Sequence, residues 1–496
     1  MDRTGKRQRT SNHSEVGKDH IQQLIVELQH TVASKNRLNI LRELLQFVRY
    51  DDDPSKRGYR CHATTLSQLV KGRCIVQLLC IQLGYMLSRR GASWCYMDIH
   101  DSSLEIKLTL TIIDVFYQYC PEMITEELMR NEGIEILRLS KDMLMNNRSF
   151  GSEIFLPILS IWHSYSSSTP GTMLLLHHPI TLQAISNILS KVQKELPYQE
   201  QIIMESLGIL KNLSYYGEDY RHRIVDQTNL LTNLTSLSLV DVPNDKGHER
   251  LSAVFRNLAL STEVRSRLIQ RADVLNAIVR IIINVTIPNE YRNVDESKID
   301  CRKNTLRNIL SVVTSLAIDT NTAHLILFHG EGILMEQLEN CVIHSEDLVI
   351  RKRAVRAFRL LARDPTSAPI MVLQNNKILE ILSDRTLNDV SNAVRMEAAE
   401  AFAQCACLIR APMTQHDYIL DMLTQMIMFS KTTTTTAINI DAIAKVAQEQ
   451  TACVENRVSI GKRGYLLKGL AYIILNESSS LKAKESKLRY CTYILR

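Results

Sequence analysis

The sequence contains little of what strand-rich and turn-rich proteins need. Among 496 residues there are only 17 glycines, 11 prolines and 2 tryptophans, and aromatic residues make up 6%. Glycine and proline both stand well below their average usage. Few stretches alternate apolar and polar residues in the way that strands with one solvated face do. These deficits predict an all-α protein.

Long apolar segments are also missing. No run of 18 apolar residues occurs, and the opening stretch, residues 1–6, contains no apolar core of a secretory signal. The eleven cysteines are odd in number and stand singly within helical patterns, as at Cys74 and Cys301. This usage is typical of reduced thiols that fill small core positions. We therefore expect a cytoplasmic chain that binds no membrane. The basic stretch Lys6-Arg7-Gln8-Arg9 resembles a nuclear import signal and leaves nuclear entry open.

Motifs for catalysis and for metal or nucleotide binding are not found. The sequence has no phosphate-binding Gly-x-x-x-x-Gly-Lys-Ser/Thr, no His-Glu-x-x-His, no Gly-x-Ser-x-Gly and no paired Cys-x-x-Cys. Cys405-Ala406-Cys407 has no histidine nearby to complete a metal site, so we interpret these cysteines as buried thiols. The sequence predicts a non-enzymatic protein with no cofactor, no catalytic residue and no metal.

What the chain does contain is a repeat. One residue in each of seven stretches ends an apolar helical pattern, and the intervals between these anchor residues are 45, 51, 45, 58, 45 and 44. The anchors are Tyr117, Trp162, Leu213, Leu258, Leu316, Leu361 and Cys405. A second apolar run opens 16 to 18 residues after six of the anchors, for example at Leu230, Ile333 and Ile378. A period of 40 to 50 residues in a helix-rich chain predicts stacked helical units.

A short sequence motif also recurs around the anchors. It occurs as Lys211-Asn212-Leu213-Ser214, Arg256-Asn257-Leu258-Ala259 and Arg359-Leu360-Leu361-Ala362. These phrases, and the glycines before two of the second runs (Gly133 and Gly332), resemble the armadillo repeat. The last two units, with Asp389 and Val394-Arg395, also look like HEAT repeats. The resemblance implies an all-α, right-handed α-solenoid of stacked armadillo or HEAT-like helical repeats.

The expected organisation has four parts. Residues 1–19 form a disordered basic arm, 20–101 an N-terminal helical cap with a degenerate repeat, 102–430 the armadillo-like repeats, and 431–496 a linker and C-terminal helical cap. The longest interval contains residues 288–297, which are polar and predict a loop between two repeats.

In the armadillo family the third helix of each unit lines a concave groove that grips an extended partner segment. Counted back from the anchor, positions −1, −5, −8 and −12 share one helix face, whereas −4 and the anchor itself face the core. The candidate partner-binding residues are Asn212, Asn257, Arg250, Asn308, Arg353, Arg356 and Gln404. The resemblance implies that Asn212 and Asn257 clamp a peptide backbone, since an amide both donates and accepts. The alternative is that both are solvated residues on an open helix face.

Armadillo receptors for nuclear import signals also place a tryptophan four residues before each such asparagine. Here those positions are Gly208 and Ala253. The aromatic walls that would hold lysine side chains are therefore absent, which argues against a receptor of that kind.

One helix is strongly basic, with six arginines and lysines between residues 350 and 363. Four of them are spaced as one stripe, with Arg353 beside it: Lys352, Arg356, Arg359 and Arg363. Guanidinium groups favour carboxylate or phosphate, so an acidic partner is one interpretation. The other is a charged outer face balanced by Glu397 and Glu400. A net charge of +6 on 496 residues favours a protein over a nucleic acid as partner.

The sequence thus predicts a protein-interaction scaffold that binds an extended or acidic segment in its concave groove. A nuclear transport adaptor and a structural assembly factor of a cytoskeletal or ciliary complex are the alternatives. Neither the partner nor the oligomeric state follows from the sequence.

Overall fold

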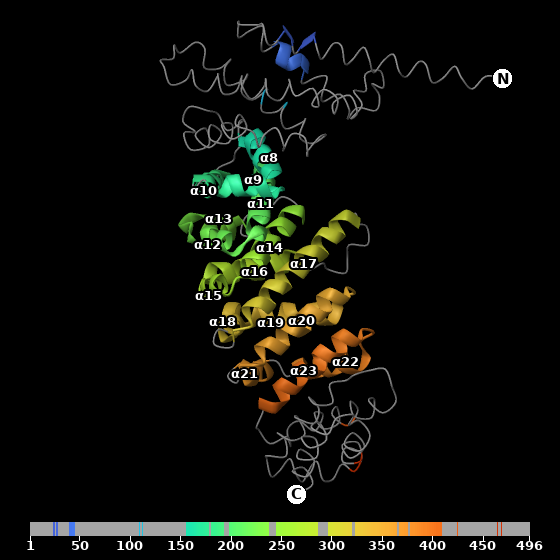
Figure 1. The fold of residues 1–496 in the computed structure, drawn as a ribbon. Coiled ribbons are helices and arrows are strands. Elements are labelled where there is room, and N and C mark those ends of the chain that lie inside the picture. The colour runs from blue at the N-terminus through green and yellow to red at the C-terminus, as the bar shows by residue number, and fades with distance from the viewer. Residues whose placement is uncertain are drawn as a thin grey trace, which may run out of the picture. The chain divides into compact units, whose positions relative to one another are not determined.

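The computed structural model describes mainly the middle of the chain. The described residues are 155–177, 180–192, 198–237, 245–285, 296–319, 323–364, 367–374 and 377–408, with 23–24, 26–27, 39–44, 109, 112, 424, 464 and 468 in addition. The chain divides into two compact units, residues 1–237 and 238–496, which we call unit 1 and unit 2. Every labelled element in Figure 1 is a helix, and the described residues contain no strand.

The helices of unit 1 follow a repeating order in which a short first helix stands between two longer helices. A long third helix closes one repeat, and a first and a second helix open the next. Unit 1 contains α8 (Phe155–Ser166), α9 (Thr169–His177), α10 (Ile180–Val192), α11 (Gln199–Tyr216), α12 (Glu218–Asp226) and α13 (Thr228–Leu237). The third helices α8 and α11 pack against each other, and so do the second helices α10 and α13.

Unit 2 continues the same order. Its third helices are α14 (Asp245–Leu258), α17 (Glu296–Leu316), α20 (Leu348–Leu361) and α23 (Asn392–Leu408). Its first helices are α15 (Thr262–Ile269), α18 (Ala323–Phe328) and α21 (Ser367–Gln374). Its second helices are α16 (Ala272–Val285), α19 (Ile333–His344) and α22 (Lys377–Asn388), with the short 3₁₀ helix η5 (His329–Gly332) before α19. Each third helix packs against the next, and Figure 1 shows α15, α18 and α21 following one another along one edge of this unit.

The predicted core positions lie in the core. Six anchors, from Trp162 to Cys405, are buried side chains near the ends of third helices, and every residue at position −4 that belongs to a described unit is fully buried. Those residues are Ile158, Ile209, Val254, Val312, Ala357 and Ala401. Since no single repeat encloses these side chains, neighbouring repeats must bury them together. The seventh anchor, Tyr117, lies outside the described residues.

The predicted spacing between helices is also confirmed. Ile180 and Ile333 begin α10 and α19, and Leu230, Val274 and Ile378 lie in the first turns of α13, α16 and α22. The predicted loop at 288–297 is wrong at its end, because α17 begins at Glu296 and includes its last two residues.

Local capping chemistry sets several helix boundaries. The Ser261 side chain accepts a hydrogen bond from the amide of Val264 at the start of α15, and Asp347 accepts from the amides of Val349 and Ile350 at the start of α20. Gly332 precedes α19 with a φ of 89°, a left-handed conformation that side chains with a Cβ rarely adopt. Gly332 therefore makes a tight break between η5 and α19.

The predicted arm at 1–19 and the linker with its cap at 431–496 lie almost wholly outside the described residues, as does most of the predicted cap at 20–101. These assignments stay predictions.

Candidate functional site

In unit 1 the predicted clamp residue is already engaged. Asn212 is half-buried on α11, and its Nδ2 donates a 2.9 Å hydrogen bond to the hydroxyl of Ser166, at the end of α8. The amide oxygen of Asn212 takes part in none of the hydrogen bonds found among the described residues. Asn212 thus ties two third helices together and keeps its oxygen and its second N–H for a partner.

The glycine that stands in place of a tryptophan has a packing reason. A Cβ at Gly208 would lie 2.4 Å from Nε2 of His163, whose ring comes from α8 and covers that part of α11. The Nδ1 atom of His163 lies 2.8 Å from a carboxylate oxygen of Glu205. The space for an aromatic wall is therefore filled by an imidazole of the preceding third helix.

In unit 2 the asparagines do not lie on an open face. Asn257 is only 2% exposed and Asn308 only 7%. The Asn308 oxygen accepts from Nη1 of Arg256 at 2.9 Å, and its Nδ2 donates to the hydroxyl of Ser252 at 3.2 Å. Nη2 of Arg256 donates to the Asn257 oxygen at 3.2 Å. The interpretation of Asn257 as a solvated residue is wrong, because α17 packs over this part of α14.

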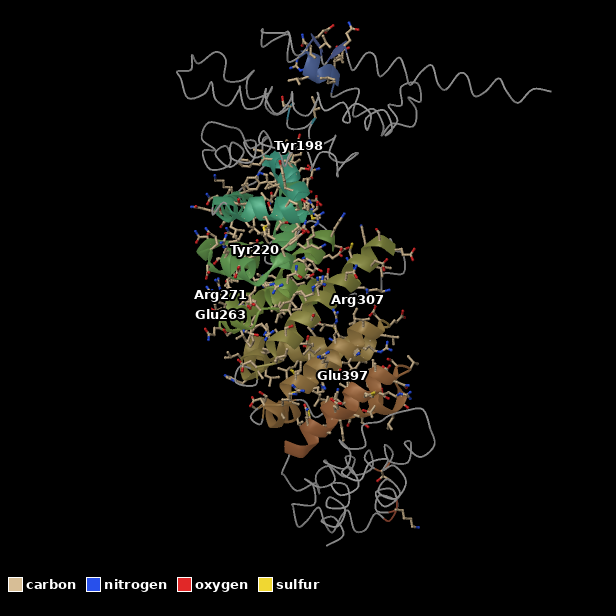
Figure 2. The ribbon with its side chains drawn as sticks, in the orientation of Figure 1. Tyr198, Tyr220, Glu263, Arg271, Arg307 and Glu397 are labelled. Atoms are coloured by element: carbon tan, nitrogen blue, oxygen red, sulfur yellow. The ribbon has the colours of Figure 1, made fainter. Side chains whose placement is uncertain are left out.

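Four arginines from three successive third helices come together on this face. We call them the arginine cluster: Arg256 on α14, Arg307 on α17, and Arg353 and Arg356 on α20. Arg353 donates through Nη1 to the main-chain oxygen of Arg307. Arg307 in turn donates to Asp347 at 2.5 Å and to Asn304 at 3.1 Å. Figure 2 labels Arg307 on the ribbon of α17.

The charges of the arginine cluster act on one another. Burial lowers the pKa of the Arg353 guanidinium below its usual value, and the positive charges of Arg256, Arg307 and Arg356 lower it further. Asp347 acts in the opposite direction, but it is a single carboxylate. Arg356 is exposed and forms no hydrogen bond or ion pair with another described residue. Positive charge is therefore concentrated at this point of the face.

Two other arginines of the basic helix α20 form ion pairs with acidic residues of the next repeat. Arg351 is buried, and its Nε lies 2.9 Å from a carboxylate oxygen of Asp389. Arg359 pairs with Glu397 at 2.9 Å and with Glu400, both on α23, where Figure 2 labels Glu397. Of the two interpretations of this helix, the balanced charged face holds for Arg359. The arginine cluster retains the excess charge.

The two remaining candidate residues lie at other points of the third helices. Arg250 is half-buried on α14 and interacts with at least one other residue. Gln404 is half-buried on α23, and its Oε1 is buried without a hydrogen-bond partner in the described part of the chain. Neither is joined to the arginine cluster by the contacts described above.

Sequence reasoning missed two members of the cluster and its counter-ion. Arg256 and Arg307 occupy positions −2 and −9, off the predicted stripe, and Asp347 precedes α20. One signal was present, since each of these arginines stands directly before an asparagine, in Arg256-Asn257 and Arg307-Asn308. The offset side chains reach the face because arginine is long.

The described residues offer little for other kinds of site. They contain no group of three or more histidine, cysteine or acidic residues placed to hold a metal. Cys405 is buried, as expected, and burial raises the pKa of the Cys341 thiol to about 12. No helix among the described residues has the length and apolar character needed to cross a bilayer.

Comparison with known proteins bears on the fold. No protein-family profile matches the sequence, and no curated protein matches it. A crystal structure of Uso1-1 aligns over 97% of this chain and 79% of that chain, at 12% identity and a TM-score of 0.55. The chain has an armadillo-like repeat fold.

Two further similar structures are a designed armadillo repeat protein and an engineered protein. They align over 53% and 54% of this chain and over 99% and 98% of their own lengths. Their identities are 14% and 13% and their TM-scores are 0.40 and 0.39. Likeness at such identities concerns the fold alone. The order of helices, the buried anchors and the likeness to Uso1-1 at a TM-score of 0.55 together confirm the predicted all-α solenoid of armadillo-like repeats.

Proposed function

We propose that the chain is a non-catalytic scaffold that binds an extended segment of a partner protein along its third helices. A helical repeat fold is suited to protein binding, because stacked helices present long surfaces. The observation that carries the proposal is the convergence of Arg256, Arg307, Arg353 and Arg356 from α14, α17 and α20. Side chains from three repeats can be engaged at once by a segment that runs across the third helices.

The polar groups on this face suit a peptide. In unit 2, Arg356 offers a whole guanidinium. In unit 1, taken by itself, the half-buried Asn212 of the third helix α11 offers an amide oxygen that could accept from a main-chain amide. We propose Arg250, Asn257, Asn308 and Gln404 as flanking residues of the face, with Asn257 and Asn308 acting mainly by holding Arg256 in place. Arg353 supports the same face through its bond to α17.

Site-specific photo-crosslinking tests this proposal. A photoreactive phenylalanine analogue replaces Val349 in one variant of the full chain and Ile283 in another. Val349 is exposed at position −12 of the third helix α20, so the probe leaves the arginine cluster intact. Ile283 is a matched control, because it is also an exposed aliphatic residue of unit 2 but lies on the second helix α16. After irradiation in native extract, mass spectrometry identifies the attached peptides.

We expect crosslinks from position 349 to concentrate in one extended segment of each partner, and position 283 to give few. Crosslinks from position 283 alone would contradict binding along the third helices. The number of partners separates the alternatives: many unrelated proteins favour a transport adaptor, and one stoichiometric complex favours an assembly factor.

A further inference from the structure

The arginine cluster carries more positive charge than its surroundings balance. Four guanidinium groups face one carboxylate, Asp347, which leaves a local charge of +3 among these five side chains. The Asp347 carboxylate already accepts hydrogen bonds from Arg307 and from two main-chain amides at the start of α20. Like charges at short range repel one another unless an anion joins them.

Donor groups in the cluster remain available. Nε of Arg307 is buried and has no hydrogen-bond partner in the described part of the chain. Arg353 uses only Nη1, in its bond to the Arg307 carbonyl, and Arg356 uses none of its donors. A buried donor without a partner is costly, so a ligand that accepts from it gains binding energy.

The number and sign of these groups identify the ligand chemistry. A carboxylate brings one negative charge, whereas a phosphorylated side chain brings about 1.5 to 2 and three strong acceptor oxygens. Guanidinium forks bind such oxygens two at a time. We propose that the arginine cluster binds a phosphorylated serine or threonine of the partner segment, which rests on the proposed function of the third-helix face.

The surroundings of the cluster favour a single phosphate over a nucleic-acid backbone. A nucleic acid presents a row of phosphates and requires cations along its whole track. On the neighbouring helix α23, Glu397 and Glu400 form ion pairs with Arg359. A nucleic acid would bring its next phosphates toward these carboxylates, which carry charge of the same sign. Positive charge is thus focused at one point of the face.

Three peptide libraries test the proposal on the immobilised full chain. All have degenerate flanks, and the fixed central residue is phosphoserine, glutamate or serine. We expect retention of the phosphoserine library to exceed that of the other two by roughly tenfold, because hydrogen bonds to charged groups are the stronger ones. Arg356→Glu removes this preference, and the matched control Arg280→Glu leaves it unchanged, since Arg356 and Arg280 are both exposed arginines.

A second variant distinguishes a role in phosphate binding from a role in the fold alone. Asp347→Asn keeps an oxygen that can accept from the amides of Val349 and Ile350, and raises the charge of the cluster from +3 to +4. We expect it to bind the phosphoserine library roughly two- to fivefold more strongly, as an added interaction between partly exposed charges would. A residue that served the fold alone would give no gain.

The other outcomes overturn the inference in distinguishable ways. Equal retention of all three libraries, lost in Arg356→Glu, would leave the proposed peptide-binding function standing and remove the phosphate from it. No retention of any library, with crosslinks still found at position 349, would do the same. Retention of an unlabelled DNA duplex with a steep dependence on salt would assign the cluster to nucleic acid instead.

Discussion

Replacing Arg351 with methionine tests how neighbouring repeats of unit 2 are held together. Arg351 lies in the first turn of α20, and its guanidinium reaches Asp389 in the connection between α22 and α23. Nε and Nη2 lie 2.9 and 3.3 Å from the two carboxylate oxygens. Nη1 donates to the carbonyls of Ser345 and Glu346 at 2.8 and 3.0 Å. One side chain thus links two successive repeats.

The expected cost follows from burial. The side chain of Asp389 is fully buried, and removal of one partner from a buried pair costs about 3 to 5 kcal/mol because the other charge is left unpaired. A second cation softens this loss, since Nη1 of Arg385 stays 3.8 Å from Asp389. The carbonyls of Ser345 and Glu346 belong to partly exposed residues and can turn to water. We therefore expect about 3 kcal/mol, roughly a 100-fold change in the local opening equilibrium.

Hydrogen exchange followed by mass spectrometry measures that opening helix by helix, which suits a repeat protein whose units need not unfold together. Arg351→Met should lose protection in α20, α22 and α23 by about that factor. Adding Asp389→Asn removes the unpaired charge, and its amide oxygen can still accept the 2.8 Å hydrogen bond from the Ser391 amide. The double variant should recover most of the protection. Unchanged exchange in Arg351→Met, or no recovery in the double variant, would refute this account of the buried pair.

Three other predictions concern stability. Leu258→Asp places an unpaired charge at a fully buried anchor, so thermal unfolding followed by circular dichroism should begin at a temperature lower by several degrees or more. An unchanged melting curve would contradict the repeat assignment. Gly208→Ala places a Cβ 2.4 Å from the His163 ring and should lower the free energy of urea unfolding by about 1 to 3 kcal/mol, recovered by adding His163→Ala. Burial raises the pKa of Asp347, but hydrogen bonds from Arg307 and two amides lower it more, so the folded chain holds this proton less readily than the unfolded chain. The stability that the Asp347 carboxylate contributes should be present above the unfolded pKa and lost as the pH falls through the folded pKa. Urea unfolding between about pH 6 and pH 3 should therefore show a smaller loss of stability in Asp347→Asn than in the unaltered chain.

The repeat architecture could be predicted because burial recurs at a fixed spacing. Each repeat must hide its apolar face against the next, so residues such as Leu213, Leu258 and Leu361 return at the same point of every third helix. The second apolar runs follow at a nearly constant distance because one short first helix and its turns span the gap. These are local requirements, and a single sequence displays them.

The sequence could not show which polar residues are free to bind. The spacing of Asn257 left both a clamp and a solvated residue open, and Arg351 is one of six basic residues in one helix. Both are buried, because the neighbouring third helix α17 and the connection after α22 cover them. The contacts at these places join residues far apart in the chain: Arg256, beside Asn257, contacts Asn308 at a separation of 52 positions, and Arg351 contacts Asp389 at a separation of 38.

The sequence by itself therefore determined the helices, their order and their core faces, because apolar spacing and capping act within one repeat. Only the tertiary structure decided how the charges are distributed. It paired Arg359 with the acids of α23 and gathered Arg256, Arg307 and Arg353 around one carboxylate. Pairing of that kind depends on distances between side chains of different repeats, which packing sets and spacing along the chain does not.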